Sequence, residues 1–495
     1  MKMSKTFYDL NSLLIFANIV ICGTVVYLYG TKDGNTPVNV FTIVLVCIFA
    51  MENIGMLSYE KKMNNPFIII LVLVTTVFYM LRVATIIHIP ASVSLYEETF
   101  VPSANELNYT LTFIFLSNAV MFLGFYLGGK NIATQNKVTC EDDNVPKIRN
   151  AIVLILILIF IDFSNVSSTE LFGRFTGYIQ YIFNRHTILL FTFTMLVYHY
   201  NKISLRNLML FMVLTIAVVI LTTLSGSRSS ILSVAMLLLM SVLAVKQRIM
   251  ISKKIIIICL ILIPLSFILF ATATLKRQLG ITANVSVEQL YAAKESEIFD
   301  FDNIEHLLVN IYYRLGYLNW SADLIANTEK FATIINSQYY FKSIIDNVLS
   351  PGFDVFNTRK ASLALSYVNT GQNIPDDVHE VSQSYLSSQM GIYGEYYVLF
   401  YGYPALVVFF FLAFMIQRIY VNFKSKNNFR YYLYTAVMLN LFYLHLNSYG
   451  IDWFAMDVVT SIITVFLFVR FYDSKRCKKN ILMPTQKGMQ SQVVA

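Results

Sequence analysis

Charged residues are scarce in this chain of 495 residues, since Asp, Glu, Lys and Arg together make up only 13% of it. An ordinary soluble domain carries about twice that share, so this composition argues against one. The five cysteines are widely spaced and include no CxxC pair, which excludes a disulfide framework. The sequence also has no HExxH motif, no Walker loop and no supported GxSxG motif. We therefore predict neither a metal site nor a cofactor.

Long apolar runs, by contrast, recur along nearly the whole chain, and 56% of its residues are apolar. A membrane-spanning helix needs roughly 20 mainly apolar residues. The runs predict about twelve spans, which makes the fold all-α and polytopic. The predicted spans are Leu13–Tyr29, Val38–Ser58, Pro66–His88, Tyr109–Leu127, Ala151–Phe163, Thr187–Tyr200, Leu208–Leu224, Ser230–Val245, Ile255–Ala273, Tyr396–Ile416, Tyr431–Leu446 and Trp453–Phe471.

Basic residues are concentrated in alternate short loops. If the N-terminus is inside, the inner loops contain pairs such as Lys61–Lys62 and Lys253–Lys254, whereas the outer loop Ile89–Asn108 contains no Lys or Arg. Short cytoplasmic loops carry an excess of Lys and Arg, so we predict that both termini are cytoplasmic. This distribution accounts for the formal charge of +8 without a nucleic-acid partner.

One long polar segment, from Thr274 to Gln389, interrupts the apolar runs, and the loop charges predict that it is extracytoplasmic. Apolar residues recur at helical spacing in Ser286–Asn310 and Ala322–Leu349. We therefore expect the segment to be partly helical and docked on the bundle. The predicted division is nine spans in 1–273, the large loop in 274–392, three spans in 393–472 and a cytoplasmic tail in 473–495.

Several arginines are predicted at the outer face, where the positive-inside rule expects few. Arg228 lies in the small-residue turn Ser225–Ser230, just before a predicted helix whose free N–H groups suit an anion. Its planar guanidinium matches phosphate oxygens, although it would equally suit a tight hairpin whose arginine reaches the lipid headgroups. Arg82 either faces an anionic cavity or pairs with Asp457. The arginines of this predicted set are Arg82, Arg174, Arg228, Arg277 and Arg314.

His379 is the strongest candidate for acid–base chemistry that the loop offers. It lies in the acidic run Asp376–Glu380, shortly before the tenth predicted span. A histidine among carboxylates can hold a pKa suited to a general base. The alternative is an exposed loop histidine without a role, which is the commoner case.

Three short motifs, in this layout, resemble the repeat-unit polymerases of bacterial O-antigen and capsule assembly (the Wzy type). The turn Ser225–Ser229 looks like the family's small-residue turn with an arginine, and Arg314–Gly316 looks like its loop arginine followed by glycine. His379 is also similar to the loop histidine of the O-antigen ligases, where Asn usually follows it, whereas Glu380 follows here. The motif that resembles the end of the polymerase loop consists of Gly391, Gly394, Glu395 and Gly402.

The resemblance implies a GT-C-like fold in the cytoplasmic (inner) membrane of a bacterium. It implies a metal-independent glycosyltransferase that moves a growing glycan from undecaprenyl diphosphate onto the next lipid-linked repeat unit. The donor and acceptor are then both undecaprenyl-diphosphate-linked oligosaccharides, and a chain-length regulator is a further partner. On this hypothesis His379 or Glu395 is the base, Arg228 and Arg314 bind diphosphate, and Arg277, Arg174 and Arg82 assist.

Two other functions fit the same layout. An O-antigen ligase would share the topology but transfer the glycan to lipid A core. A flippase for the same lipid would show repeat symmetry and charges deep in the bundle, with short loops. The single large loop late in the chain favours the polymerase.

Overall fold

A computed structural model of the protein describes helices both from the predicted spans and from the predicted large loop. The described residues are 7–31, 36–87, 100–130, 185–199, 209, 230–246, 250–252, 317–349, 355–369, 390–424, 429–447 and 450–472. Their regular secondary structure is helical apart from one short antiparallel pair, β1 (Phe7–Asp9) with β2 (Met250–Ser252), which confirms the all-α class. Six of the described helices are long and apolar enough to cross a membrane.

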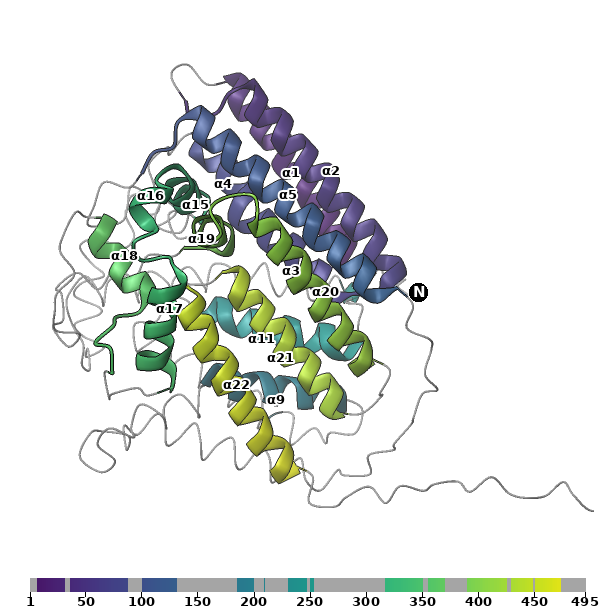
Figure 1. Ribbon diagram of the computed structural model, residues 1–495. Coiled ribbons are helices and arrows are strands. Elements are labelled where there is room, and N and C mark those ends of the chain that lie inside the picture. Colours follow the sequence, from purple (N-terminus) through teal and green to yellow (C-terminus); the bar gives the residue numbers. More distant parts are fainter. Residues whose placement is uncertain are drawn as a thin grey trace, which may run out of the picture.

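The N-terminal part is a bundle of long helices (Figure 1): α1 (Leu10–Thr31), α2 (Val40–Met63), α3 (Pro66–Val74) and α5 (Ala104–Gly129). The α3 helix continues through a π-helical stretch, η1 (Thr75–Met80), into α4 (Leu81–Ile86). Asn39 caps α2, since its side chain accepts the backbone N–H of Thr42 at 2.9 Å. Pro66 opens α3 at the first helical position, where its missing N–H costs nothing.

The C-terminal part consists of α20 (Ala405–Lys424), α21 (Phe429–Leu446) and α22 (Ile451–Tyr472), with α9 (Arg185–His199) and α11 (Ser230–Lys246) packed against α21. Its closest contact with the N-terminal part is between α5 and α20. A Cβ at Gly124 would lie 2.5 Å from the carbonyl oxygen of Phe410, and one at Gly128 would lie 2.7 Å from that of Phe414. This GxxxG spacing lets two membrane helices approach closely.

Five short helices from the predicted loop and its end lie together at one end of the bundle (Figure 1). They are α15 (Tyr317–Ala326), α16 (Thr328–Phe331), α17 (Ser337–Ile344), α18 (Ala361–Asn369) and α19 (Ile392–Leu399), with a π-helical turn, η3 (Ile345–Leu349), after α17. They share an apolar core that includes Leu324, Phe331 and Tyr340. The described part of the loop is thus helical and docked on the bundle, as predicted, but broken at Asn327 and Asn336, the residues before α16 and α17.

The tenth predicted span, Tyr396–Ile416, differs from the structure. Tyr396 belongs to α19, and the membrane helix α20 begins only at Ala405. Between them, Tyr401 and Gly402 have φ angles of +52° and +103°, which end the helix and turn the chain. The apolar run continues through this turn, so hydropathy alone joins the two helices.

Three predicted spans, Ala151–Phe163, Leu208–Leu224 and Ile255–Ala273, lie outside the described residues except for Met209, which is helical. Apart from these three and the tenth, each predicted span overlaps a described helix. The structure describes 15 residues of α9 and 17 of α11, fewer than the roughly 20 of a typical span.

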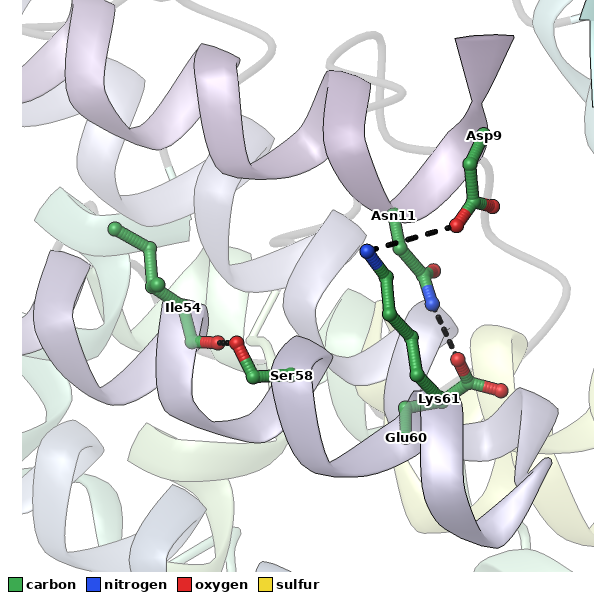
Figure 2. A network of polar contacts seen from close by, with 6 residues as sticks. All are labelled: Asp9, Asn11, Ile54, Ser58, Glu60 and Lys61. Atoms are coloured by element: carbon green, nitrogen blue, oxygen red, sulfur yellow. Dashed lines mark hydrogen bonds and ion pairs between the residues drawn. The ribbon is translucent and has the colours of Figure 1, made fainter. Parts of the chain in front are cut away.

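The end opposite α15–α19 is formed by chain segments that the sequence predicts on one side of the membrane. There β1 pairs with β2, and the Lys424 ammonium donates to the carbonyl oxygen of Asn64 at 3.1 Å. In Figure 2, Lys61 lies 3.8 Å from the Asp9 carboxylate, and Asn11 donates to Glu60. These contacts agree with the prediction that successive spans among the described helices run in alternating directions across the membrane.

Candidate functional site

Glu395 is the buried acid at the centre of the α15–α19 end. It lies on α19, outside the candidate spans, and has no exposed surface. One carboxyl oxygen, Oε1, accepts the backbone N–H of Ile451 at 2.7 Å and the hydroxyl of Tyr340, while Oε2 has no partner. Burial raises the pKa of Glu395 from 4.5 to about 8, although the two hydrogen bonds oppose the rise. The carboxyl is therefore mainly protonated at neutral pH.

Asp452, in the first turn of α22, is a second buried carboxylate, with 1% of its surface exposed. It accepts the Ser343 hydroxyl at 2.6 Å and the backbone N–H groups of Ala361 at 2.7 Å and Trp453 at 2.9 Å. Ser343 belongs to α17 and Ala361 begins α18, so one carboxylate joins three helices. Asp452 was not predicted from the sequence, because the last predicted span begins one residue later, at Trp453.

A lysine and a tryptophan extend this junction. The Lys360 ammonium lies 3.4 Å from the centre of the Trp453 ring, a cation–π contact, and the indole N–H of Trp453 donates to the Ser362 hydroxyl at 2.9 Å. Burial lowers the pKa of Lys360 to about 8, against the opposing effect of Asp452 and Asp457. The Asp452 carboxylate and the Lys360 ammonium thus both lie at the first turn of α22.

Arg82, on α4, is buried at the same end of the molecule, with 1% exposure. Its Nε donates to the Asn319 side-chain oxygen at 2.9 Å, and its Nη1 donates to the Thr85 hydroxyl at 3.1 Å. Asn319 in turn donates to the carbonyl oxygen of Phe100 at 3.3 Å. These contacts connect α4 to α15 and to the segment before α5, and Asp457 is not among the described partners.

The glycines of the Gly391–Gly402 motif have conformational reasons to be glycine. Gly391 has a φ of +63°, and a Cβ there would lie 3.0 Å from the Tyr79 hydroxyl. At Gly394 a Cβ would meet the Ser321 Cα at 3.0 Å and the Leu324 Cδ1 at 2.9 Å. The motif therefore packs α19 tightly against α15 and η1 and places Glu395 inward.

The remaining predicted site residues stay predictions, because the structure does not describe them. Of the predicted set, only Glu395 and Arg82 are placed, and both lie at the α15–α19 end without touching one another directly. Within the described ranges, no three His, Cys, Asp or Glu side chains converge in a way that would hold a metal ion. The undescribed candidates are Arg174, Arg228, Arg277, Arg314 and His379.

The apolar helices and the helical segment docked on one end define a multi-pass membrane protein. The sequence profile of the family described as O-antigen polysaccharide polymerase Wzy matches residues 13–480, so the chain belongs to that family. This confirms the resemblance found in the sequence and makes the protein a glycosyltransferase-type polymerase of lipid-linked repeat units. No curated protein and no solved structure shows significant similarity to the chain.

Proposed function

We propose that the protein polymerises undecaprenyl-diphosphate-linked oligosaccharide repeat units at the outer face of the cytoplasmic membrane. In each cycle the growing glycan moves from its lipid diphosphate to a hydroxyl of the next lipid-linked unit. The family match over 13–480 is the observation that carries this proposal. A chain-length regulator is a further expected partner.

The proposed sidedness follows from charge. Lys61 and Lys424 lie at the end opposite α15–α19, together with the N-terminal strand. The positive-inside rule makes that end cytoplasmic. The α15–α19 end then faces outward, and its buried polar groups lie where two lipid-linked substrates can meet in a fixed orientation.

The proposed reaction breaks the bond between the sugar's anomeric carbon and the diphosphate oxygen and forms a glycosidic bond to the acceptor oxygen. The acceptor's proton passes to a base, and the lipid diphosphate leaves with its negative charge. We assign Arg228 and Arg314 to that charge, with Arg277 and Arg174 in support, because preorganised cations stabilise a leaving anion. Neither a nucleotide sugar nor a metal takes part in this proposal.

Among the predicted bases, we assign the proton transfer to His379. Glu395 has no exposed surface, and its pKa of about 8 keeps it protonated, which suits a group that holds helices together. Arg82 is buried against Asn319 and Thr85, so we assign it to positioning α15 rather than to direct diphosphate contact.

Removing the Arg228 charge tests the assignment in cells. The polysaccharide of a deletion strain is compared after complementation with the unchanged protein, Arg228→Ala or Arg418→Ala. Arg418 is the matched control. It lies over the Phe414 ring in the C-terminal half of α20, away from the α15–α19 end. We expect Arg228→Ala to yield single repeat units and Arg418→Ala to yield full-length polymer. Normal chain length with Arg228→Ala would show that the assignment is wrong.

A further inference from the structure

Three consecutive residues at the start of α22, Ile451 to Trp453, hold three helices of the α15–α19 end. They follow Gly450, whose φ of +142° and close neighbours admit no side chain: a Cβ there would lie 2.6 Å from the Met390 Cε and 2.8 Å from the Asp452 carboxylate. The turn is thus built tightly into the junction. Each of the three residues contributes a different polar group.

Asp452 and Trp453 of α22 contact successive residues at the start of α18. Asp452 accepts the N–H of Ala361, and the Trp453 ring covers the Lys360 ammonium and donates its indole N–H to Ser362. Lys360, just before α18, and Ala361 and Ser362 at its start are therefore fixed to two successive residues of α22. Such a match sets both the position and the rotation of α18.

The neighbouring helices are held at the same turn. Asp452 also accepts the Ser343 hydroxyl of α17, and the Ile451 N–H donates to Glu395 of α19. The chain between Asn369, where α18 ends, and Met390, just before α19, includes His379. It therefore leaves from one helix that this turn holds and returns to another.

We propose that Asp452 is a positioning residue for glycan transfer, acting by fixing α17 and α18 on the outer end of α22. The inference rests on the proposed polymerase function. A carboxylate that accepts three hydrogen bonds at 2.6 to 2.9 Å orients its partners more strictly than an apolar contact would. Transfer between two lipid-anchored substrates needs such strict placement, because a displacement of about 1 Å can cost a hundredfold in rate.

The first test compares Asp452→Asn with the unchanged full-length protein in lipid nanodiscs. The substrates are lipid-linked repeat units isolated from a strain that lacks the protein. The amide keeps the shape of the carboxylate but loses its charge and one acceptor oxygen. We expect turnover at saturating substrate to fall about tenfold or more while KM stays within about twofold. We also expect faster hydrogen exchange at the N–H of Ala361.

Asp323→Asn is the matched control. Asp323, on α15, is also buried, but its carboxylate accepts a local hydrogen bond from the Asn327 side chain, four residues further on, at 2.8 Å. We expect that variant to keep full turnover. An equal loss in both variants, or normal turnover and normal exchange in Asp452→Asn, would overturn the proposal.

A second pair of variants keeps the proposal testable if Asp452→Asn does not fold. Trp453→Phe keeps an aromatic ring at this position and removes the indole N–H that bonds to Ser362, and Ser362→Ala removes the same bond from the other side. If this bond positions α18, each variant lowers turnover and the double variant lowers it no further. Additive losses, or none, would contradict the proposal. An unchanged protein that makes no polymer would instead contradict the proposed function, and the exchange at Ala361 would still decide whether the turn holds α18.

Discussion

The two ends of this bundle use polar residues differently. At the end opposite α15–α19, Lys61 and Asp9 lie 3.8 Å apart with side chains 42% and 27% exposed (Figure 2). At the α15–α19 end, Arg82, Glu395 and Asp452 have at most 1% exposure. The α15–α19 end thus buries several ionisable groups, whereas at the opposite end Glu60, with 1% exposure, lies beside the exposed pair.

This difference indicates where in the fold the side chains are held in a fixed geometry. An exposed ion pair contributes little, because water and salt screen it. A buried ionisable group is costly unless it is hydrogen-bonded, so a cluster of them persists where specific placement is needed. The α15–α19 end is therefore the part of the described molecule in which we expect transfer to depend on the buried hydrogen bonds that join separate helices.

The largest expected loss of stability follows from removing the buried cation Arg82, compared with removing the exposed cation Lys61 at the opposite end. Arg82→Ala removes the hydrogen bond from the Arg82 Nε to the buried Asn319 side chain and should destabilise the protein by about 3 kcal/mol, with loss of polymer. Lys61→Ala should cost less than about 1 kcal/mol and leave polymer length unchanged. Thermal unfolding of the purified proteins, with polymer length in cells, measures both. Equal losses would remove the contrast between the ends.

A steric test on the membrane helices comes next. Gly124→Ala would push a methyl group into the Phe410 carbonyl and separate α5 from α20, which we expect to cost about 1–3 kcal/mol. Gly55→Ala is the control on α2, where no atom lies within 4 Å of the added Cβ. That variant should be neutral or slightly stabilising, because Ala favours a helix more than Gly does. Unfolding temperatures in the same lipid decide the matter, and equal values for the two variants would rule out the close contact.

A smaller effect is expected for Glu395→Gln. The carboxyl is protonated at neutral pH, so an amide should replace it with less than about a threefold change in polymerisation rate. If Glu395 were the catalytic base, the amide would abolish the reaction. The rate of purified protein on lipid-linked repeat units separates these outcomes.

The pH dependence of stability follows from the same group. Because folding raises the pKa of Glu395 from 4.5 to about 8, the folded protein retains a proton that the unfolded chain has lost. The stabilisation is fully present below pH 4.5 and is lost as the pH rises to about 8. Unfolding temperatures at pH 5 and pH 9 should therefore differ less in Glu395→Gln than in the unchanged protein. The same difference in both would show that Glu395 does not titrate as described.

The smallest effect concerns two thiols between the bundle's ends. The sulfur atoms of Cys22 on α1 and Cys47 on α2 lie 3.3 Å apart. Mild oxidation with copper phenanthroline should join them in a disulfide, detected as a cross-linked peptide pair, without loss of polymerisation. Failure to cross-link would show that α1 and α2 do not pack in this register, and Cys22→Ser is the control.

The sequence predicts features that a single helix determines, such as its apolar length, but not the contacts that depend on a second helix. Apolar runs located the described spans, because lipid requires about 20 apolar residues whatever surrounds them. The contact of Gly124 and Gly128 with α20 was not predicted, since the motif does not say which helix it meets. Likewise, Glu395 was found by its motif, but its burial depends on Tyr340 and Ile451, far away in sequence.

Polymer synthesis by the isolated protein is the most direct test of the central claim. Full-length protein in nanodiscs receives lipid-linked repeat units, with lipid A core offered in a parallel reaction. We predict lipid-linked chains of many units, with one undecaprenyl diphosphate released for each unit added. Transfer only to lipid A core, or no glycan transfer by a folded protein, would contradict the assignment.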